Sequence, residues 1–198
     1  CEKVAKAKDV PQLMGHGFNL FAPVVAEHQR EEFEFVLGLM RRVAVRVPGI
    51  KLRLYGVKAV TAERLEKQLA GTGLVLDLMP FLTYEAYCRS LRDAAIGLSP
   101  IMYQSPFSRG KSFGKILGYL DAKTPVICSD EVDHALFFDA GQGIVSNDVN
   151  VWEAAICDWI AAPHLRQGIA DNAFKAFEDR LSVATSSRFV DGFLRELL

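Results

Sequence analysis

Two lysines and a serine lie close together in the stretch 99–129, where they could bind an anion. Lys111, Ser112 and Lys115 follow the turn-forming Gly110, which puts the serine at a helix N-cap or in a first helical turn. The unpaired N–H groups of a helix start, the positive end of its dipole and lysine ammonium groups all favour an anion. Phosphate is the ligand that this pattern predicts. The alternative, equally compatible with the spacing, is that both lysines belong to a solvent-exposed helix face.

The helix that would carry these residues is amphipathic. Phe113, Ile116, Leu117 and Leu120 recur at helical spacing and predict a face that packs on a sheet. Short apolar strands are expected on either side of it, at 95–98 and 126–128. A strand, a long loop, a helix and a second strand together form the crossover that parallel strands require.

Composition narrows the class of protein. The chain has 198 residues, 50% of them hydrophobic, and a formal net charge of −1, which predicts a sizeable core and argues against nucleic-acid binding through bulk charge. We expect neither a membrane span nor a signal peptide, and scattered cysteines that stay reduced. A cytoplasmic protein is therefore expected, with at most peripheral association at the inner face of a membrane. No metal site is expected, because the histidines lack ligand spacing and the acidic loop 130–133 is more typical of a solvated loop.

The remaining pattern alternates strands and helices. Strands are expected at 18–21, 51–55, 74–78 and 141–145, and long helices at 27–47, 151–162, 164–180 and 185–197. Thr83 and Asp148 are expected to cap the helices that follow them, at 84–92 and 151–162. Trp152 and Trp159, seven residues apart on one helix face, are expected in the core. This order predicts an α/β fold with a doubly wound, Rossmann-like, mostly parallel six-stranded sheet and a carboxyl-terminal helical tail. We expect a leader or linker at 1–17, an α/β domain at 18–150 and the tail at 151–198.

Several candidate ligand residues follow strands directly. Gly56 and Met79 end or follow two of them, Phe81 comes shortly after, and the loop 100–110 contains Arg109. Ligands of doubly wound sheets bind at the carboxyl ends of the strands, so these segments should line one pocket. No GxGxxG and no Walker pattern occurs, which weakens the dinucleotide and P-loop alternatives.

The same residues carry a resemblance to a known family. Tyr55-Gly56, the stretch 93–100, Gly110-Lys111-Ser112, the stretch 115–119 and the stretch 124–127 together resemble the carboxyl-terminal half of a GT-B glycosyltransferase. The resemblance implies that this half binds a nucleotide-sugar donor, that its final helices cross back to an amino-terminal half, and that the missing half receives the acceptor. The acceptor would be a glycan or a lipid-linked glycan.

The sequence also departs from that family. Its broad retaining group has two glutamates with seven residues between them, where this chain has Gly110 and Gly118, and a basic pair where this chain has Ala22-Pro23. Ser112 and Lys115 are similar to the Ser-x-x-Lys pattern of xanthan-type glucuronosyltransferases. Retention and inversion of the anomeric centre both stay open.

The resemblance assigns expected roles to individual residues. Lys111, Ser112, Lys115 and Arg109 would bind the donor diphosphate, without metal or cofactor. Gly56, Met79, Phe81 and Tyr119 would surround the nucleoside of a UDP- or GDP-sugar, although packing against a strand is an equal alternative for Tyr119. No carboxylate here predicts an acceptor base. Two other functions remain open, a nucleotide-sugar epimerase of similar fold and a non-catalytic nucleotide-sugar-binding or assembly module.

Overall fold

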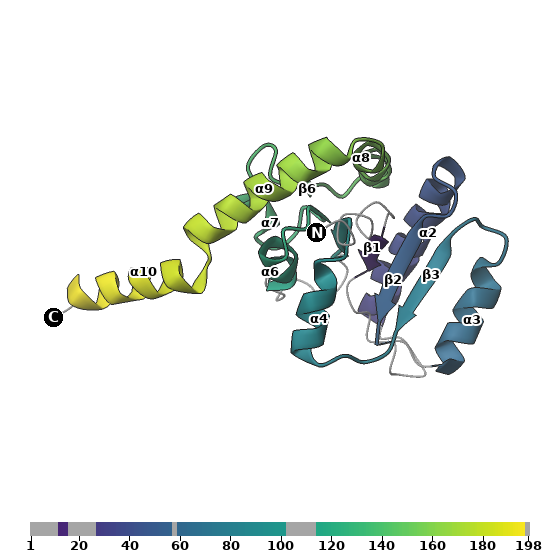
Figure 1. The fold of residues 1–198 in the computed structure, drawn as a ribbon, viewed down its shortest axis with the longest axis horizontal. Coiled ribbons are helices and arrows are strands. Elements are labelled where there is room, and N and C mark those ends of the chain that lie inside the picture. The colour runs from purple at the N-terminus through teal and green to yellow at the C-terminus, as the bar shows by residue number, and fades with distance from the viewer. Residues whose placement is uncertain (1–11, 16–26, 57–58, 102–113, 197–198) are drawn as a thin grey trace, which may run out of the picture.

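The domain has three layers, a parallel sheet with helices on both faces (Figure 1). The computed structural model describes residues 12–15, 27–56, 59–101 and 114–196. Its strands lie in the order β3-β2-β1-β4-β5-β6, and every neighbouring pair is parallel. The strands are β1 (Gln12–Gly15), β2 (Lys51–Tyr55), β3 (Val75–Met79), β4 (Ile96–Ser99), β5 (Val126–Cys128) and β6 (Ile144–Val145). The predicted Rossmann-like α/β architecture is confirmed.

The first strand lies earlier in the chain than the sequence suggested. β1 is Gln12–Gly15 and pairs with both β2 and β4 at the centre of the sheet. The interval 1–17, expected to be a leader or linker, therefore contains a central strand, while the expected strand 18–21 lies outside the described residues. β1 has only four residues, too few for a clear alternating pattern, and Gly15 occupies its last paired position.

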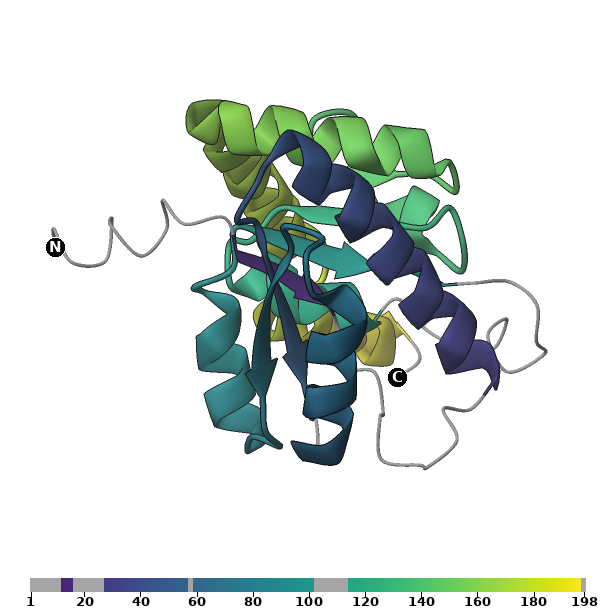
Figure 2. The same cartoon turned by 90° about the vertical axis from the view of Figure 1, so that its right-hand side faces the viewer.

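One face of the sheet is covered by α2 (Glu27–Arg46), α3 (Ala59–Leu69) and α8 (Val149–Ala161), and Figure 2 shows α2 crossing in front of the strands. Apolar residues at helical spacing in α2, from Phe33 to Ala44, form the centre of this layer. Trp152 and Trp159 of α8 are buried there as predicted, at 0% and 3% exposure. The indole N–H of Trp152 donates to the carbonyl oxygen of Ser146 over 2.7 Å, which satisfies its polar atom.

The opposite face is covered by α4 (Tyr84–Leu91), α6 (Gly114–Asp121), α7 (His134–Phe137) and α9 (Pro163–Arg180). Side chains of β5 alternate between the two layers: Val126 and Cys128 join this cluster and Ile127 joins the other. Gly97 of β4 lies under Tyr119, where an added Cβ would be 2.6 Å from the ring. The glycine thus allows α6 to approach the sheet closely.

Two helix starts are capped as the sequence predicted. The Thr83 hydroxyl accepts the N–H of Ala86 at the start of α4. The Asp148 carboxylate accepts the N–H of Asn150 at the start of α8. Both side chains satisfy N–H groups that have no partner within the helix.

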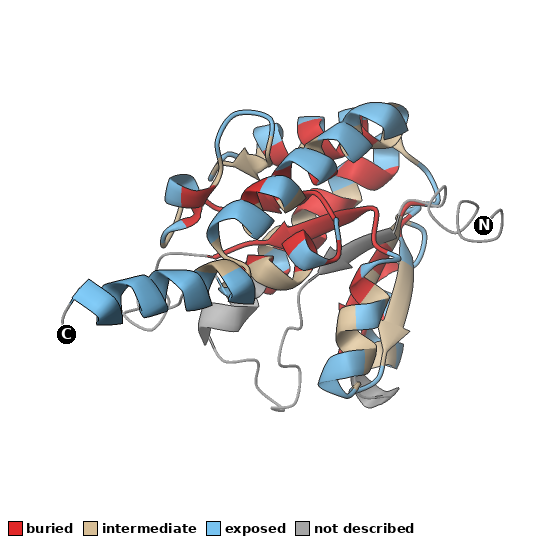
Figure 3. Cartoon of the chain, turned by 60° about the vertical axis from the view of Figure 1, so that its left-hand side comes forward, coloured by how far each residue is buried: buried red, intermediate tan, exposed pale blue. Residues whose placement is uncertain are grey.

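The last helix, α10 (Val183–Glu196), extends away from the three layers and contacts α9. No residue of α10 within the described range is buried, and Figure 3 shows it exposed along its length. Phe189, Val190, Phe193 and Leu194 are all more than half exposed. In the described part of the chain, no helix combines the length and apolar character needed to cross a membrane.

Candidate functional site

The carboxyl ends of the strands meet at one edge of the sheet. In the parallel register Tyr55 of β2 lies beside Met79 of β3, and Cys128 of β5 lies beside both Ser99 of β4 and Val145 of β6. The loops that follow these residues therefore leave the sheet on the same side. Such an edge is where doubly wound sheets bind ligands.

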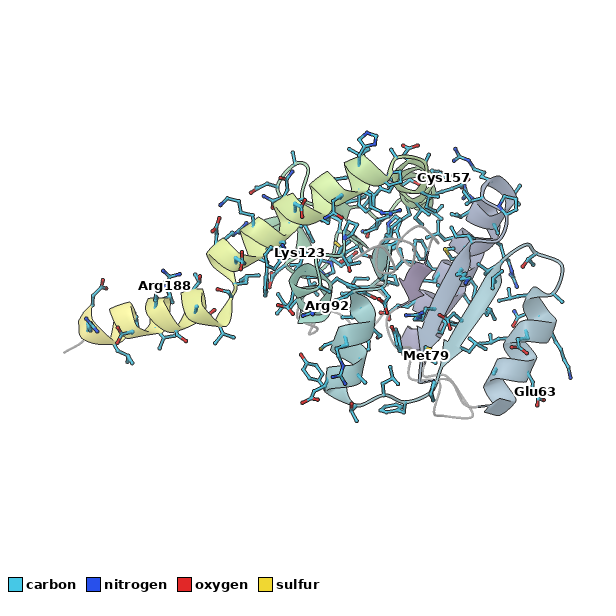
Figure 4. All side chains as sticks on the ribbon, in the orientation of Figure 1. Glu63, Met79, Arg92, Lys123, Cys157 and Arg188 are labelled. Atoms are coloured by element: carbon cyan, nitrogen blue, oxygen red, sulfur yellow. The ribbon has the colours of Figure 1, made fainter. Side chains whose placement is uncertain are left out.

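Three of the residues predicted to contact a nucleoside lie at this edge. Gly56 directly follows β2 and has a φ of 72°, a left-handed conformation that favours glycine. Met79 stands at the tip of β3 (Figure 4) and packs partly against the cluster under α4. The ring of Phe81, two residues further on, is 73% exposed. The sheet thus brings Gly56, Met79 and Phe81 to one side of the domain.

Tyr119, the fourth predicted nucleoside contact, is instead a core residue. Its side chain has 0% exposure and its ring lies against Gly97. Complete burial raises the pKa of its hydroxyl well above 10.0, because the charged form would lose its hydration. The ribose contact expected for Tyr119 is therefore wrong for this conformation, and the alternative role of packing on the strand describes it.

Of the four predicted diphosphate ligands, Lys115 falls within a described element, the helix α6. The described helix begins at Gly114, so Lys115 is its second residue, and the structure describes only its backbone. Arg109, Lys111 and Ser112 lie outside the described residues. Because α6 runs back along the sheet after β4 and Tyr119 covers Gly97, the first turn of α6 lies toward the carboxyl end of β4.

Gly118, where the retaining group has a glutamate, has a packing role here. A Cβ added to Gly118 would lie 3.0 Å from Cδ1 of Leu91 in α4, closer than side-chain carbon atoms usually approach. The glycine lets α4 and α6 pack tightly, so it does not by itself indicate a degenerate site.

Buried polar groups gather where β4 and β5 end. Ser99, Ser129 and His134 have exposures of 0%, 3% and 0%. The Ser129 hydroxyl accepts the N–H of Ile101 over 2.9 Å, and the Ser129 N–H donates to the carbonyl oxygen of Ser99 over 3.3 Å. Hydrogen bonds thus join the ends of both strands just before their loops diverge.

His134 completes this network from α7. Its Nδ1 lies 2.8 Å from the carbonyl oxygen of Ser129, which can only accept, so Nδ1 carries a proton. Burial lowers the pKa of His134 below 6.5, so the imidazole is neutral near pH 7. Among the described residues, neither Nε2 of His134 nor Oγ of Ser99 has a hydrogen-bond partner. Buried polar atoms without partners are uncommon, and here they mark the carboxyl edge.

The acidic loop after β5 is tied to the loop after β6. The Asp130 N–H donates to Oδ1 of Asn147 over 2.9 Å, and Nδ2 of Asn147 donates to Oε1 of Glu131 over 3.0 Å. Val132 has a φ of 50°, which is rare for a β-branched residue. Within the described ranges, no three His, Cys, Asp or Glu side chains are grouped to hold a metal ion. The sequence analysis missed the bond of Ser129 to Ile101 and those of Asn147 to Asp130 and Glu131, since these partners are 28, 17 and 16 residues apart.

Comparison with known proteins gives no match by sequence: no family model matches the chain, and no curated protein matches it significantly. Solved structures do match by fold. A TarM variant from S. aureus, solved with UDP, superposes with a TM-score of 0.68 at 16% identity, covering 94% of this chain and 35% of that one. HepE from Anabaena, in complex with UDP and glucose, gives 0.66 at 13% identity, covering 98% and 50%.

A third neighbour is similar in size. The C-terminal domain of LpcC, a group 1 glycosyl transferase from Francisella tularensis, gives a TM-score of 0.65 at 13% identity and covers 91% of this chain and 92% of that one. This chain spans only 35% of TarM and 50% of HepE. It therefore has the fold of one domain of the GT-B glycosyltransferases that it resembles structurally.

Proposed function

We propose that this chain is the donor-binding, carboxyl-terminal half of a GT-B glycosyltransferase that uses a nucleoside-diphosphate sugar. The observation that carries the proposal is the superposition on the C-terminal domain of LpcC over 91% of this chain. Two further neighbours whose structures contain UDP support a UDP-sugar as donor, with a GDP-sugar as the alternative.

The chemistry required of such a site fits the carboxyl edge of the sheet. When the glycosidic bond breaks, negative charge accumulates on the leaving diphosphate, and fixed amides and cations aimed at it lower the barrier. Lys111, Ser112, Lys115 and Arg109 are the candidate ligands, together with the N–H groups of the first turn of α6. These groups would act without a metal ion. Gly56, Met79 and Phe81 would flank the nucleoside.

The remaining substrates and partners follow from the same proposal. The acceptor is a glycan or a lipid-linked glycan bound mainly by an amino-terminal half, as in polysaccharide biosynthesis of the xanthan type at the cytoplasmic face of a membrane. The apolar residues of α10 would contact that half. Phe189 at 77% exposure and Phe193 at 55% form an apolar surface of the kind that marks contact sites.

Thermal unfolding with added nucleotides tests the proposal. UDP, GDP, ADP and TDP at about millimolar concentration are each added with and without magnesium. A ligand that binds only the folded state raises the melting temperature by mass action, so at least one nucleotide should raise it without magnesium. No shift with any of the four would overturn the proposal. Binding without glycosyl transfer by a chain that includes the amino-terminal half would favour the non-catalytic module.

A further inference from the structure

A chain of polar side chains connects β3, β2 and α4 on the face of the sheet that α4 covers. Arg53 of β2 and Asp77 of β3 are partners in the parallel register, and Nε of Arg53 donates to Oδ2 of Asp77 over 2.6 Å. The Arg53 guanidinium also interacts with the hydroxyl of Tyr55, the last residue of β2. The Tyr55 hydroxyl in turn lies 2.7 Å from Oγ of Ser90 in α4. Side chains thus join all three elements.

The direction of the bond between Tyr55 and Ser90 follows from their partners. Oγ of Ser90 donates to the carbonyl oxygen of Tyr87 over 2.6 Å, and a hydroxyl has only one hydrogen to donate. Ser90 therefore accepts the hydrogen of Tyr55. Burial raises the pKa of Tyr55 above 10.0, so this hydrogen is present near pH 7. The Tyr55 ring also packs edge-to-face on Tyr87, with 5.1 Å between the ring centroids, so α4 holds both its ring and its hydroxyl.

The described residues predicted to flank the nucleoside lie next to Tyr55. Gly56 follows Tyr55 directly, and Met79 lies beside it in the register with β3. Phe81 lies in the chain between β3 and α4, so its position depends on how these two elements are spaced. The contacts of Tyr55 fix the end of β2 relative to α4, and the ion pair fixes β2 relative to β3. The network therefore holds each element from which these three residues come.

We propose that Tyr55 is a positioning residue for the nucleoside, whose hydroxyl bond to Ser90 sets the distance between Gly56 and the segment 79–81. The inference rests on the proposed function and names a residue that tunes the same site. Tyr55 is 6% exposed, so it acts on nucleotide affinity through its neighbours and without contact to the nucleotide. A purely structural role would change stability alone.

Thr124 provides a matched control, because its hydroxyl also ties α4 to the sheet. It is 2% exposed and donates to the carbonyl oxygen of Leu91, the neighbour of Ser90, over 2.9 Å. Thr124 directly precedes β5, which β1 and β4 separate from β2 in the sheet. Loss of this hydroxyl should therefore weaken the hold on α4 without displacing Gly56.

The test measures UDP affinity by calorimetric titration and the melting temperature of each variant. Tyr55→Phe keeps the ring and should weaken UDP binding by about three- to tenfold, roughly the effect of one hydrogen bond. Ser90→Ala removes the other side of the same bond, so it should cost the same factor, and the double variant should bind no more weakly. Ser90→Thr, which keeps the acceptor, should retain most of the affinity. Thr124→Val should lower the melting temperature about as much as Tyr55→Phe and leave the affinity within about twofold.

The outcomes separate this inference from the proposed function. Equal UDP affinities of Tyr55→Phe and Thr124→Val would overturn the positioning role and leave the proposed function intact. Additive losses from Tyr55→Phe and Ser90→Ala would overturn the assigned bond as its cause. Failure of the wild-type chain to bind any of the four nucleotides would overturn both proposals, and if it binds one other than UDP, that nucleotide is titrated instead. If Tyr55→Phe does not fold, Ser90→Ala makes the same comparison with Thr124→Val.

Discussion

The two edges of the sheet are built differently. At the amino-terminal edge α9 lies across the starts of β4 and β5, leaving a cavity of only about 20 Å³ that Ala94, Ala95 and Ala170 help to line. Thr124, a buried polar side chain at this edge, donates its hydroxyl hydrogen to the carbonyl oxygen of Leu91. At the carboxyl edge Ser99 and His134 retain buried polar atoms without partners among the described residues.

This difference in buried polar atoms indicates which edge has a role besides stability. A stable core satisfies its buried polar atoms, as the amino-terminal edge does at Thr124. The carboxyl edge departs from this rule at Ser99 and at His134, whereas left-handed backbone occurs at both edges, at Lys123 before β5 and at Val132 after it. Departures of this kind are expected at functional sites, so substitutions at the two edges should have separable effects.

The largest effect is expected in the core beneath the two edges. Replacing Tyr119, which has 0% exposure, by alanine should lower the free energy of unfolding by about 3 to 5 kcal/mol. Urea denaturation measures this loss. The remaining folded protein should bind UDP as the wild type does, because Tyr119 packs on Gly97 away from solvent. A loss of UDP affinity with unchanged stability would instead show that Tyr119 belongs to the donor site.

Glycines with a positive φ lie at both edges, so the same substitution can be compared at each edge. Gly56, at the carboxyl edge, has a φ of 72°, and Gly49, before β2 at the amino-terminal edge, has a φ of 81°. Alanine at either position should cost about 1 to 2 kcal/mol of stability, since both must stay in the left-handed region. Only Gly56→Ala should also weaken UDP binding. Equal UDP affinities of the two variants would show that Gly56 is not part of the binding site.

Acid should destabilise the carboxyl edge through His134. Because burial holds the pKa of His134 in the folded state below 6.5, the unfolded state binds a proton that the folded state does not. This contribution should therefore be constant above about pH 6.5 and should reduce stability as the pH falls below that value. His134→Gln should flatten the curve, measured by urea denaturation between about pH 5 and 8. A flat wild-type curve would contradict the prediction.

The smallest effect is expected in α10. Phe193 is 55% exposed, so Phe193→Ser should change the free energy of unfolding of the isolated chain by no more than about 0.5 kcal/mol. Phe177→Ser in α9 should cost clearly more, because Phe177 packs against the core. A large, concentration-dependent loss of melting temperature for Phe193→Ser would instead show that α10 pairs with a second copy.

Local patterns in the sequence predicted much of this fold. The strands 51–55 and 126–128 are where the residues placed them, and the caps Thr83 and Asp148 are confirmed, since each depends on residues a few positions apart. The strand β1 and the short helix α7 were not foreseen. Both elements are too short to show the regular spacing of apolar residues by which strands and helices are predicted.

The site was less predictable than the fold. Strand ends are visible in the sequence, so Gly56, Met79 and Phe81 could be assigned to one edge. The role of Ser129 depends on Ile101, 28 residues away, and on the fold that brings them together, which no spacing encodes. Tyr119 was expected near the nucleoside, but it is a core residue. It lies on a helix beside the candidate site, and its side chain faces the sheet.

The central claim, that the start of α6 binds a nucleoside diphosphate, is tested most directly by two lysine variants. Lys115 is in the first turn of α6, while Lys175 lies on α9 and pairs with Asp179 at the surface. Lys115→Ala should weaken UDP binding by about 1.5 to 3 kcal/mol, roughly ten- to over a hundredfold, because it removes a charge-assisted hydrogen bond. Lys175→Ala should leave the affinity unchanged. Equal affinities in calorimetric titration would contradict the proposed donor site.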